Sequence, residues 1–253
     1  MSGSREPQRL RQTIQAVKEH ILTQGLKPGD PMPTEVQLVE ELGVSRSNLR
    51  EAVRTLVALD ILEVRHGTGT FVGQMSMRPL VEGLTFKGVV LPGDDFKTLR
   101  QIVEVRQALD LALAPEIVAH WAGRDGAALY ALCDAMAAQK ARNDTFAAED
   151  RAFHLTLTDV LDNTLYGQLV AAFWDVHTVV APRLGVPTPR DIADTVAAHQ
   201  AMCDAAIAGE LETYQEAVLS HYAPLMRVLT GGAVSSDDAA GDGYGLEEVA
   251  SPA

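Results

Sequence analysis

Cysteine and aromatic residues are scarce in this chain of 253 residues, and long apolar runs are missing. The two cysteines, Cys133 and Cys203, lie far apart and outside any CxxC spacing. This pattern argues against a disulfide framework or a thiolate metal site, and it predicts two buried side chains that behave as small apolar residues. No run of about 18 apolar residues is present and no apolar signal core stands near the N-terminus, so the sequence predicts neither a membrane partner nor export. We therefore expect a cytoplasmic protein.

Positive charge is also in deficit, because 21 Lys and Arg face 34 Asp and Glu, a formal net charge of −13. The deficit is unevenly distributed. Residues 1–78 hold ten basic against nine acidic side chains, whereas the remainder holds eleven against twenty-five. Arginines in the first part can still neutralise phosphate, and the acidic remainder weakens non-specific binding to nucleic acid. The length and a hydrophobic content of 47% suit two domains with apolar cores.

The stretch from Gly43 to Leu56 predicts a helix with one apolar face and one face suited to DNA. Ser45 is a good N-cap, and apolar side chains recur at helical spacing at Leu49, Ala52, Val53 and Leu56. The polar side chains on the remaining surface are Arg46, Ser47, Asn48, Arg50 and Arg54. Backbone N–H groups at a helix N-terminus suit phosphate, while Arg and Asn reach base edges in the major groove. Taken alone, the same pattern also fits an ordinary amphipathic surface helix.

The neighbouring segments favour the DNA-binding alternative. Residues 34–42 predict a short helix with a capping box, Thr34 as N-cap and Gln37 three residues on, and Gly43 begins a tight turn into the next helix. This is the helix-turn-helix pattern. Residues 59–65 and 70–72 alternate as strands around a Gly-rich turn, which predicts a hairpin wing with His66 and Gly67 near its tip.

Residues 8–73 resemble the winged helix of the GntR superfamily of bacterial transcription regulators. The matching segments are Leu26-Lys-Pro-Gly-Asp30, Pro33-Thr-Glu35, Leu42-Gly-Val-Ser-Arg46, Leu49-Arg-Glu-Ala52 and His66-Gly-Thr-Gly-Thr-Phe-Val72. The resemblance implies a homodimer on an inverted-repeat operator, with contacts from Arg46, Ser47, Arg50, His66 and Gly67. Our interpretation of the helix face adds Asn48 and Arg54. One position departs from the family, because Val36 stands where relatives usually carry Arg.

The rest of the chain predicts an all-α domain behind a linker. Residues 74–95 lose periodicity and gain Pro and Gly, which is typical of a linker. Residues 96–230 are almost entirely helical in pattern, and Pro115 and Pro224 inside these stretches should kink or break their helices. Residues 231–253 have the composition of a disordered tail. The fold class is therefore mainly α, a winged helix-turn-helix followed by an all-α helical bundle. This order resembles the FadR-type subfamily, whose second domain is the FCD effector domain.

Four polar side chains of the second domain are predicted to point into its core. Asp150 and His154 are four residues apart, on one helix face. His199 and His221 each belong to an apolar stripe of a separate helix. Each residue alone fits a hydrogen-bonded core polar group. Together they match the Asp-x-x-x-His pair and two distant histidines that bind metal in FCD relatives. Three imidazoles and a carboxylate suit a divalent transition metal; we expect zinc, with nickel or manganese as alternatives.

Two further inward residues are candidates for binding an effector. Arg106 lies in a Glu-x-Arg motif whose Arg sits near the effector in relatives, although an internal ion pair with Asp110 would use the same side chain. His177 shares the inner face of its helix and could contact the effector or remain a core histidine. The resemblance implies a small carboxylate effector.

The sequence therefore predicts a metabolite-responsive transcription regulator, with repression as the usual mode in this family. An enzyme is the competing class, because a metal held by three histidines and one carboxylate could activate water for a hydrolytic or lyase-type reaction. Against that alternative, the pattern places no second carboxylate or base beside the ligands, and a DNA-binding half would have no purpose. A third possibility is a structural metal in a domain that serves only for dimerisation.

Overall fold

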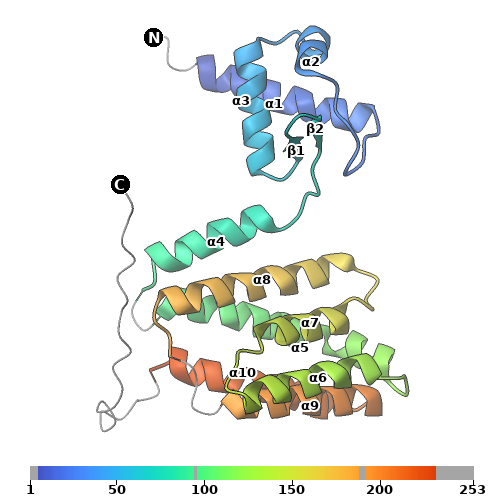
Figure 1. The fold of residues 1–253 in the computed structure, drawn as a ribbon, viewed down its shortest axis with the longest axis vertical. Helices are drawn as coiled ribbons and strands as arrows, with labels where there is room; N and C mark the ends of the chain where they lie inside the picture. The colour runs from blue at the N-terminus through green and yellow to red at the C-terminus, as the bar shows by residue number, and fades with distance from the viewer. Residues whose placement is uncertain (1–4, 94–95, 188–191, 232–253) are drawn as a thin grey trace.

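The computed structural model describes residues 5–93, 96–187 and 192–231. Within these residues the chain forms ten helices and one two-stranded antiparallel hairpin, in two parts joined through a helix that lies between them (Figure 1). The sequence prediction of a mainly α fold with one small hairpin is confirmed. In these residues no helix is both long and apolar enough to cross a membrane.

The first part is a winged helix. Its elements are α1 (Arg5–Thr23), α2 (Glu35–Leu42), α3 (Arg46–Ala58), β1 (Leu62–Arg65) and β2 (Gly69–Val72). The strands pair antiparallel from Leu62 opposite Val72 to Arg65 opposite Gly69. A separate small core holds this part together, formed by buried side chains from the three helices, both strands and the loop before α2: Val17, Ile21, Met32, Leu38, Leu49, Leu56, Leu62 and Val72.

Local sequence signals explain the helix-turn-helix. The side chain of Thr34 accepts from the backbone of Gln37, and the Gln37 side chain accepts from the backbone of Thr34, as the capping box predicts. Gly43 ends α2 in the left-handed region with φ of 63°, a conformation that costs glycine nothing. Ser45 then caps α3 by accepting from the Asn48 N–H. Two helices are thereby forced to turn within a few residues.

Most of the predicted linker is not irregular. Residues 78–90 of the stretch 74–95 form helix α4 (Arg78–Val90), which lies along the second part (Figure 1). Sequence reasoning overlooked it because Met77-Arg-Pro79 and later glycines look like breakers, whereas Pro in the first helical turn is favourable. Gly88 also has a packing role, since a Cβ there would lie 3.1 Å from the methyl groups of Val180.

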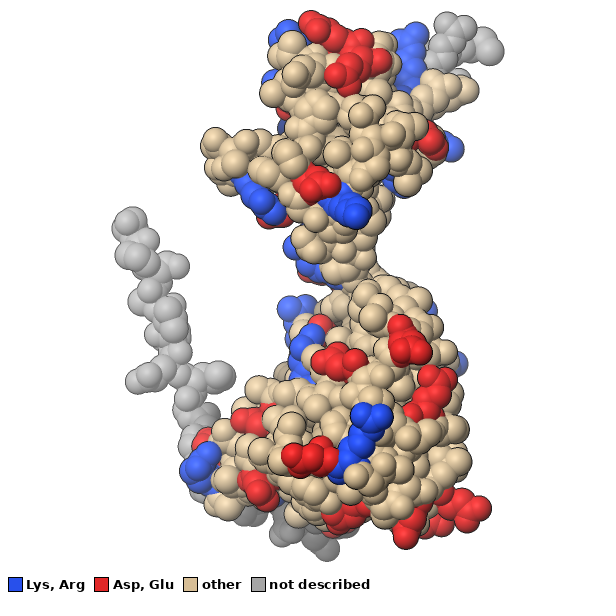
Figure 2. Space-filling model, turned by 90° about the vertical axis from the view of Figure 1, so that its right-hand side faces the viewer, with Lys and Arg blue, Asp and Glu red and all other residues tan. Residues whose placement is uncertain are grey.

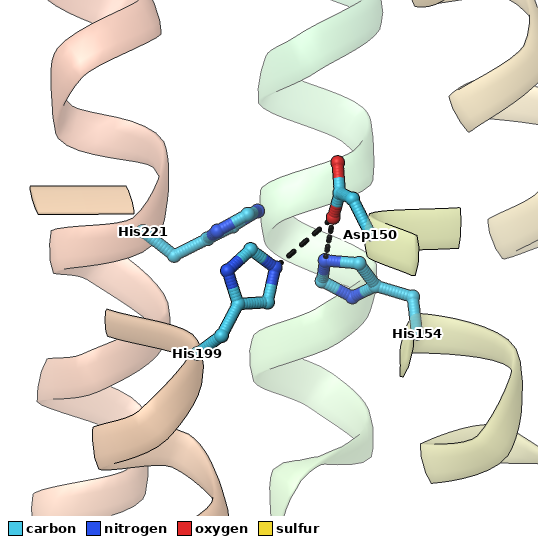
Figure 3. Close-up of side chains that lie close together, drawn as sticks. All are labelled: Asp150, His154, His199 and His221. Atoms are coloured by element: carbon cyan, nitrogen blue, oxygen red, sulfur yellow. Dashed lines mark hydrogen bonds and ion pairs between the residues drawn. The ribbon is translucent and has the colours of Figure 1, made fainter. Parts of the chain in front are cut away.

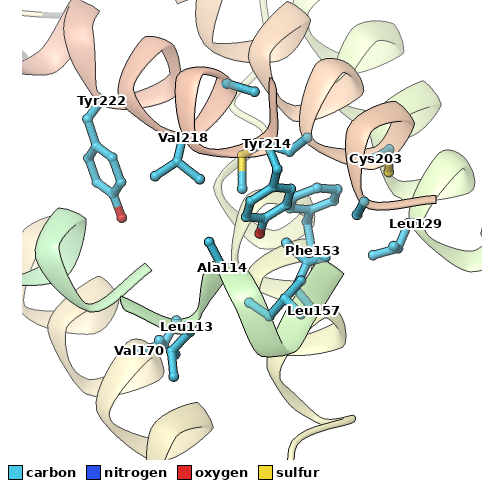
Figure 4. Close-up of a cluster of buried hydrophobic side chains, with 14 of the residues drawn as sticks. Leu113, Ala114, Leu129, Phe153, Leu157, Val170, Cys203, Tyr214, Val218 and Tyr222 are labelled. Atoms are coloured by element: carbon cyan, nitrogen blue, oxygen red, sulfur yellow. The ribbon is translucent and has the colours of Figure 1, made fainter. Parts of the chain in front are cut away.

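The second part is a helical bundle. It consists of α5 (Lys97–Trp121), α6 (Ala127–Ala141), α7 (Ala147–Thr158), α8 (Thr164–Arg183), α9 (Ile192–Ala208) and α10 (Leu211–Leu229). Apolar side chains of all six helices meet in one core, where Phe153 and Tyr214 are fully buried (Figure 4). Of the kinks or breaks expected at proline, the breaks do not occur, because α5 continues through Pro115 and α10 through Pro224. Tertiary packing evidently outweighs the loss of a backbone hydrogen bond.

The cysteines are placed as the sequence predicts, with one addition. Both are buried and unbridged, but Cys133 of α6 and Cys203 of α9 bring their sulfur atoms to 3.8 Å. The two sulfur atoms thus pack against each other between α6 and α9. The predicted tail falls almost wholly outside the described residues.

Candidate metal centre and nucleic-acid interface

Four side chains from three helices converge inside the bundle. Asp150 and His154 come from consecutive turns of α7, His199 from α9 and His221 from α10 (Figure 3). One potential ligand atom from each residue lies within 4.8 Å of all the others. The three histidines are 0–6% exposed. The structure thus brings together the four residues predicted from helical spacing, and their donor set of three nitrogens and one oxygen fits a divalent transition metal.

The hydrogen bonds around His199 leave a lone pair aimed at the centre of the cluster. Its Nδ1 donates to the carbonyl oxygen of Thr195 at 2.8 Å, so in the neutral ring Nε2 carries no hydrogen. That Nε2 lies 3.0 Å from Oδ1 of Asp150, which is also an acceptor. Two acceptors face each other favourably only with a proton or a cation between them. A shared metal ion satisfies this requirement without charging the imidazole.

The other two histidines also present nitrogen atoms without a hydrogen-bond partner. Nε2 of His154 lies 3.2 Å from the same Oδ1 of Asp150 but makes no hydrogen bond of good geometry, and Nδ1 of His221 is buried without a partner. Burying a polar nitrogen without a partner costs about 1–3 kcal/mol. Metal ligation would account for these unpaired atoms.

The electrostatics of the cluster keep its ligands in the forms that bind metal. Burial, and then the positive charge of Arg106, lower the pKa of His154 below its usual value. Burial, and then the neighbouring imidazoles, lower the pKa of His221 well below the usual value. Burial alone would raise the pKa of Asp150, but the adjacent imidazole rings of His154 and His199 outweigh burial and hold that pKa well below its usual value. A neutral imidazole and an ionised carboxylate are the forms that coordinate metal.

A small chamber adjoins the cluster. Its volume is about 130 Å³, and it is lined by side chains of the effector candidates, the cluster and nearby apolar positions: Arg106, Phe146, Asp150, His177, Ile192, Thr195, His221, Tyr222 and Leu225. Arg106 is only 2% exposed, and its Nε and Nη2 have no hydrogen-bond partner. His177 likewise leaves Nδ1 without a partner, and burial lowers its pKa to about 4. The chamber therefore combines one buried cation, one neutral imidazole and the edge of the cluster.

Asp110 does not neutralise Arg106 in the way the sequence alternative requires. Its Oδ2 accepts the hydroxyl hydrogen of Tyr222 at 2.6 Å and lies 3.7 Å from Nδ1 of His154. Arg106 instead stands over the Tyr222 ring, 5.4 Å from the centroid. The Asp110 carboxylate thus binds the Tyr222 hydroxyl and lies near His154, rather than pairing with Arg106.

A wider cavity of about 450 Å³ opens beside the small chamber. Four residues line both spaces: Phe146, Asp150, His177 and Ile192. The outer cavity also has Lys140 and Trp174 in its walls. A small molecule that enters from outside would therefore pass the cluster carboxylate before it reaches Arg106.

The candidate DNA-binding residues lie on the exposed side of α3 and at the tip of the hairpin. Arg46, Ser47, Arg50 and Arg54 are exposed, Asn48 is half-buried, and His66 and Gly67 are exposed. Three arginines of this surface have acidic partners: Arg50 with Glu35 at 3.0 Å, Arg54 with Glu51 at 3.2 Å and Arg65 with Glu63 at 2.9 Å. Gly67 turns the hairpin with φ of 75°. Basic and acidic side chains accordingly alternate over this domain, while acidic ones are spread over the bundle (Figure 2).

Comparison with known proteins identifies both parts. The family of bacterial regulatory proteins, gntR family, matches residues 10–72, and the FCD domain matches residues 101–224. An uncharacterized HTH-type transcriptional regulator of Mycobacterium tuberculosis (strain ATCC 25618 / H37Rv) is 31% identical over 203 residues, which cover 77% of this chain and 78% of that protein. The chain belongs to the GntR family.

Two further relatives support the assignment of this GntR-family chain. The galactonate operon transcriptional repressor of Escherichia coli (strain K12) is 24% identical over 202 residues, 80% of this chain and 88% of that protein. The solved structure of Streptococcus agalactiae GntR has a TM-score of 0.62 at 25% identity and covers 86% of this chain and 99% of its own. The chain is therefore a DNA-binding transcription regulator with an effector domain, and the enzyme alternative is set aside.

Sequence reasoning missed the residues that position the cluster of this GntR-family regulator. Trp174 donates from Nε1 to Oδ2 of Asp150 at 3.1 Å, and Tyr222 fixes Asp110. Both partners are far away in sequence, and an inward Trp or Tyr is indistinguishable from a core residue in a single sequence. The Thr195 carbonyl could have been found, since it lies one helical turn before His199.

Proposed function

We propose that this regulator is a repressor that binds an inverted-repeat operator as a homodimer and is released by a small organic acid. The observation that carries the proposal is the buried guanidinium of Arg106, whose Nε and Nη2 have no partner beside a chamber of about 130 Å³. Buried guanidinium N–H groups without an acceptor are costly, and a carboxylate bound through two parallel N–H···O bonds would satisfy them. The regulator is expected to act in the cytoplasm.

We propose that Asp150, His154, His199 and His221 hold the metal ion. Zinc is the expected ion, and nickel and manganese fit the same donor types. When bound, the ion supplies a Lewis acid that attracts carboxylate and hydroxyl oxygens. The chain's own residues do the rest: Thr195 fixes the His199 tautomer, and Arg106 attracts and orients the acid.

The chamber suits a short acid that also carries a hydroxyl group. Arg106 would bind the carboxylate, and the unpartnered Nδ1 of His177 can exchange a hydrogen bond with a neighbouring hydroxyl. Phe146, Ile192 and Leu225 supply apolar walls. The name of the galactonate operon repressor, a relative over most of the chain, is consistent with a hydroxy acid as the chemical class.

The operator is proposed to be bound by α3 and the wing. Arg46, Ser47, Asn48, Arg50 and Arg54 would lie in or beside the major groove, while His66 and Gly67 contact the backbone or the minor groove. A two-fold protein requires a two-fold operator, so the site should be an inverted repeat. The arginines bonded to Glu35, Glu51 and Glu63 would exchange these carboxylates for phosphates or bases.

A purely structural metal is the alternative, and the chamber argues against it. A structural ion needs ligands, but it needs neither an adjoining cavity nor an Arg106 with two N–H groups that lack acceptors. Substituting Arg106 by Met separates the two functions. We expect the variant to keep its metal and its operator affinity. The concentration of hydroxy acid needed to release the operator should rise at least tenfold.

The experiment measures operator release by fluorescence anisotropy against a panel of short hydroxy acids, with galactonate among them. Metal content is measured in parallel by elemental analysis. Arg100→Met, at a half-buried position of the same helix where the arginine pairs with Glu104, is the control for loss of an arginine. Release by the same acid at the same concentration from wild type and Arg106→Met would refute the proposed carboxylate contact.

A further inference from the structure

Two consecutive contacts join α7 to α8 beside the cluster. On the inner side, Nε1 of Trp174 donates to Oδ2 of Asp150 at 3.1 Å. On the outer side, Nε of Arg151 donates to Oδ1 of Asp175 at 2.9 Å. Adjacent residues of a helix point about 100° apart. Asp150 and Trp174 therefore meet on the inner side of α7 and α8, and their neighbours Arg151 and Asp175 meet on the outer side. The inner contact belongs to the cluster, and the outer one faces the DNA-binding part.

The inner contact divides the two oxygens of Asp150 between different tasks. Oδ1 faces Nε2 of His199 and Nε2 of His154, and Oδ2 is occupied by the indole N–H of Trp174. Trp174 therefore presents Asp150 as a one-oxygen ligand. Because such hydrogen bonds orient metal ligands, any shift of the carboxylate on binding also pulls on α8.

The outer contact borders a cavity between the two parts of the molecule. This space of about 390 Å³ is lined on one side by Arg151, Gln168 and Asp175, and on the other by residues that include Ser76 and Arg78. Helix α4 rests directly on α8 above it, where Gly88 allows close approach to Val180. Helices α8 and α4 are thus in direct contact next to this cavity.

Helix α4 is joined to the winged helix without a flexible joint. Asp60 accepts from the backbone N–H of Ser76 at 2.9 Å, from its hydroxyl at 2.5 Å and from Arg78 at 3.4 Å. Backbone bonds run from Gly73 to Ile61 at 2.8 Å and from Met75 to Asp60 at 2.9 Å. A Cβ at Gly73 would collide with the carbonyl oxygen of Asp60. The first residues of α4 therefore move with the hairpin and α3.

We propose that Trp174 is a positioning residue for Asp150, and that the pairs Asp150–Trp174 and Arg151–Asp175 together transmit the state of the cluster through α8 and α4 to the winged helix. The inference rests on the proposed metal site. These contacts would connect the metal cluster to the winged helix, which contributes no ligand to the cluster. The inference also assigns separate tasks: Trp174 acts on the metal and the route, Asp175 on the route alone.

The test follows amide hydrogen exchange of the full chain, stripped of metal by chelation and then loaded with zinc ions alone. In wild type, zinc should slow exchange in α7 and α8 and also in residues 74–90. Trp174→Phe should lower zinc affinity about tenfold or more, as loss of an orienting hydrogen bond does. Even when zinc saturates the Trp174→Phe variant, amide exchange in residues 74–90 should remain as fast as without zinc. Asp175→Asn should change zinc affinity by no more than about twofold, but zinc should no longer slow amide exchange in residues 74–90 of this variant.

Matched controls separate these effects from general damage. Trp121→Phe removes the other tryptophan of the sequence, which is 8% exposed against 7% for Trp174 and whose indole nitrogen has no partner. Glu104→Gln breaks the ion pair with Arg100 on α5. Both controls should behave as wild type.

Three results would overturn the inference. If zinc binds the wild type but leaves exchange in residues 74–90 unchanged, the route is absent while the proposed metal site stands. If Asp175→Asn keeps the zinc-dependent slowing of residues 74–90, the outer pair is not part of the route. If elemental analysis finds no zinc retained by the cluster, the metal site itself fails and the inference fails with it.

Discussion

The two domains place their candidate functional residues in opposite environments. In the winged helix these residues are exposed or half-buried and close in sequence, from Arg46 to Arg54 and at His66 and Gly67. In the bundle they are buried or half-buried and come from positions as distant as Arg106 and His221. An exposed side chain contributes little to the fold, whereas a buried charge or imidazole without partners costs stability. Substitutions in the first domain should therefore affect binding alone, and those in the second should affect binding and stability together.

The largest effect should come from the histidines of the cluster. The double variant His199→Ala, His221→Ala removes two of four ligands, so zinc affinity should fall more than about 100-fold, since changes merely around a site already cost 10–100-fold. The variant should still bind the operator, because the DNA-binding residues lie in another domain, but it should respond poorly to the effector. Elemental analysis and anisotropy titration measure the two quantities.

A histidine outside the cluster is the natural control for this variant. His120→Ala, near the end of α5, should keep full metal content and unchanged operator release. Retention of one metal per chain by the double variant, together with normal release, would remove the metal from the mechanism.

The same contrast explains what one sequence could and could not predict. The winged helix is encoded locally, since Thr34, Gly43 and Ser45 set each turn through contacts within a few residues, and it was predicted almost completely. Helical spacing predicted that the four cluster residues face inward, and the resemblance to FCD relatives singled them out from other inward residues such as His177. Helix α4 was missed because its stability comes from packing on α8 rather than from its own pattern. Trp174 was missed because its partner Asp150 is a tertiary neighbour.

The next largest effect should be on operator affinity, from Arg50. Arg50→Ala should weaken specific binding by about 1–3 kcal/mol while metal content and unfolding temperature stay unchanged. The surface ion pair with Glu35, at 3.0 Å, contributes little to stability and competes with DNA. Glu35→Gln should therefore tighten binding modestly. Anisotropy titration checks both variants, and Arg142→Ala in the bundle serves as the control. Equal affinity of wild type and Arg50→Ala would exclude Arg50 from the interface.

Acidification should distinguish the buried histidines from the exposed DNA-binding surface. The pKa values of His154 and His221 are lowered by burial in the folded protein, whereas unfolding returns them to about 6.5. The unfolded chain then binds more protons, so the stability of the metal-free protein should fall as pH drops below about 6.5, by at most about 1.4 kcal/mol per pH unit per histidine. The lowered pKa of Asp150 adds stability that is fully present above about 3.8 and is lost only at lower pH, so it does not change the slope in this window.

Urea unfolding of the chelated protein between pH 7 and pH 5 measures this slope. His221→Gln removes one titrating group and should flatten the slope, while His120→Gln should leave it as in wild type. A slope that is the same in His221→Gln and wild type would mean that His221 takes up no proton on unfolding in this range.

The smallest effect concerns Val36, the position where the family usually carries Arg. Val36 is 51% exposed in the first turn of α2, the helix that crosses the DNA backbone in helix-turn-helix proteins. Val36→Arg should add one phosphate contact, which steepens the dependence of log affinity on log salt by about 0.9 and changes affinity less than tenfold at physiological salt. Val36→Gln has a similar reach without the charge, so its salt slope should equal that of wild type. Titrations at several salt concentrations, on the operator and on unrelated DNA, decide the matter. If Val36→Arg and Val36→Gln show one slope, α2 does not approach the phosphates, and binding rests on α3 and the wing.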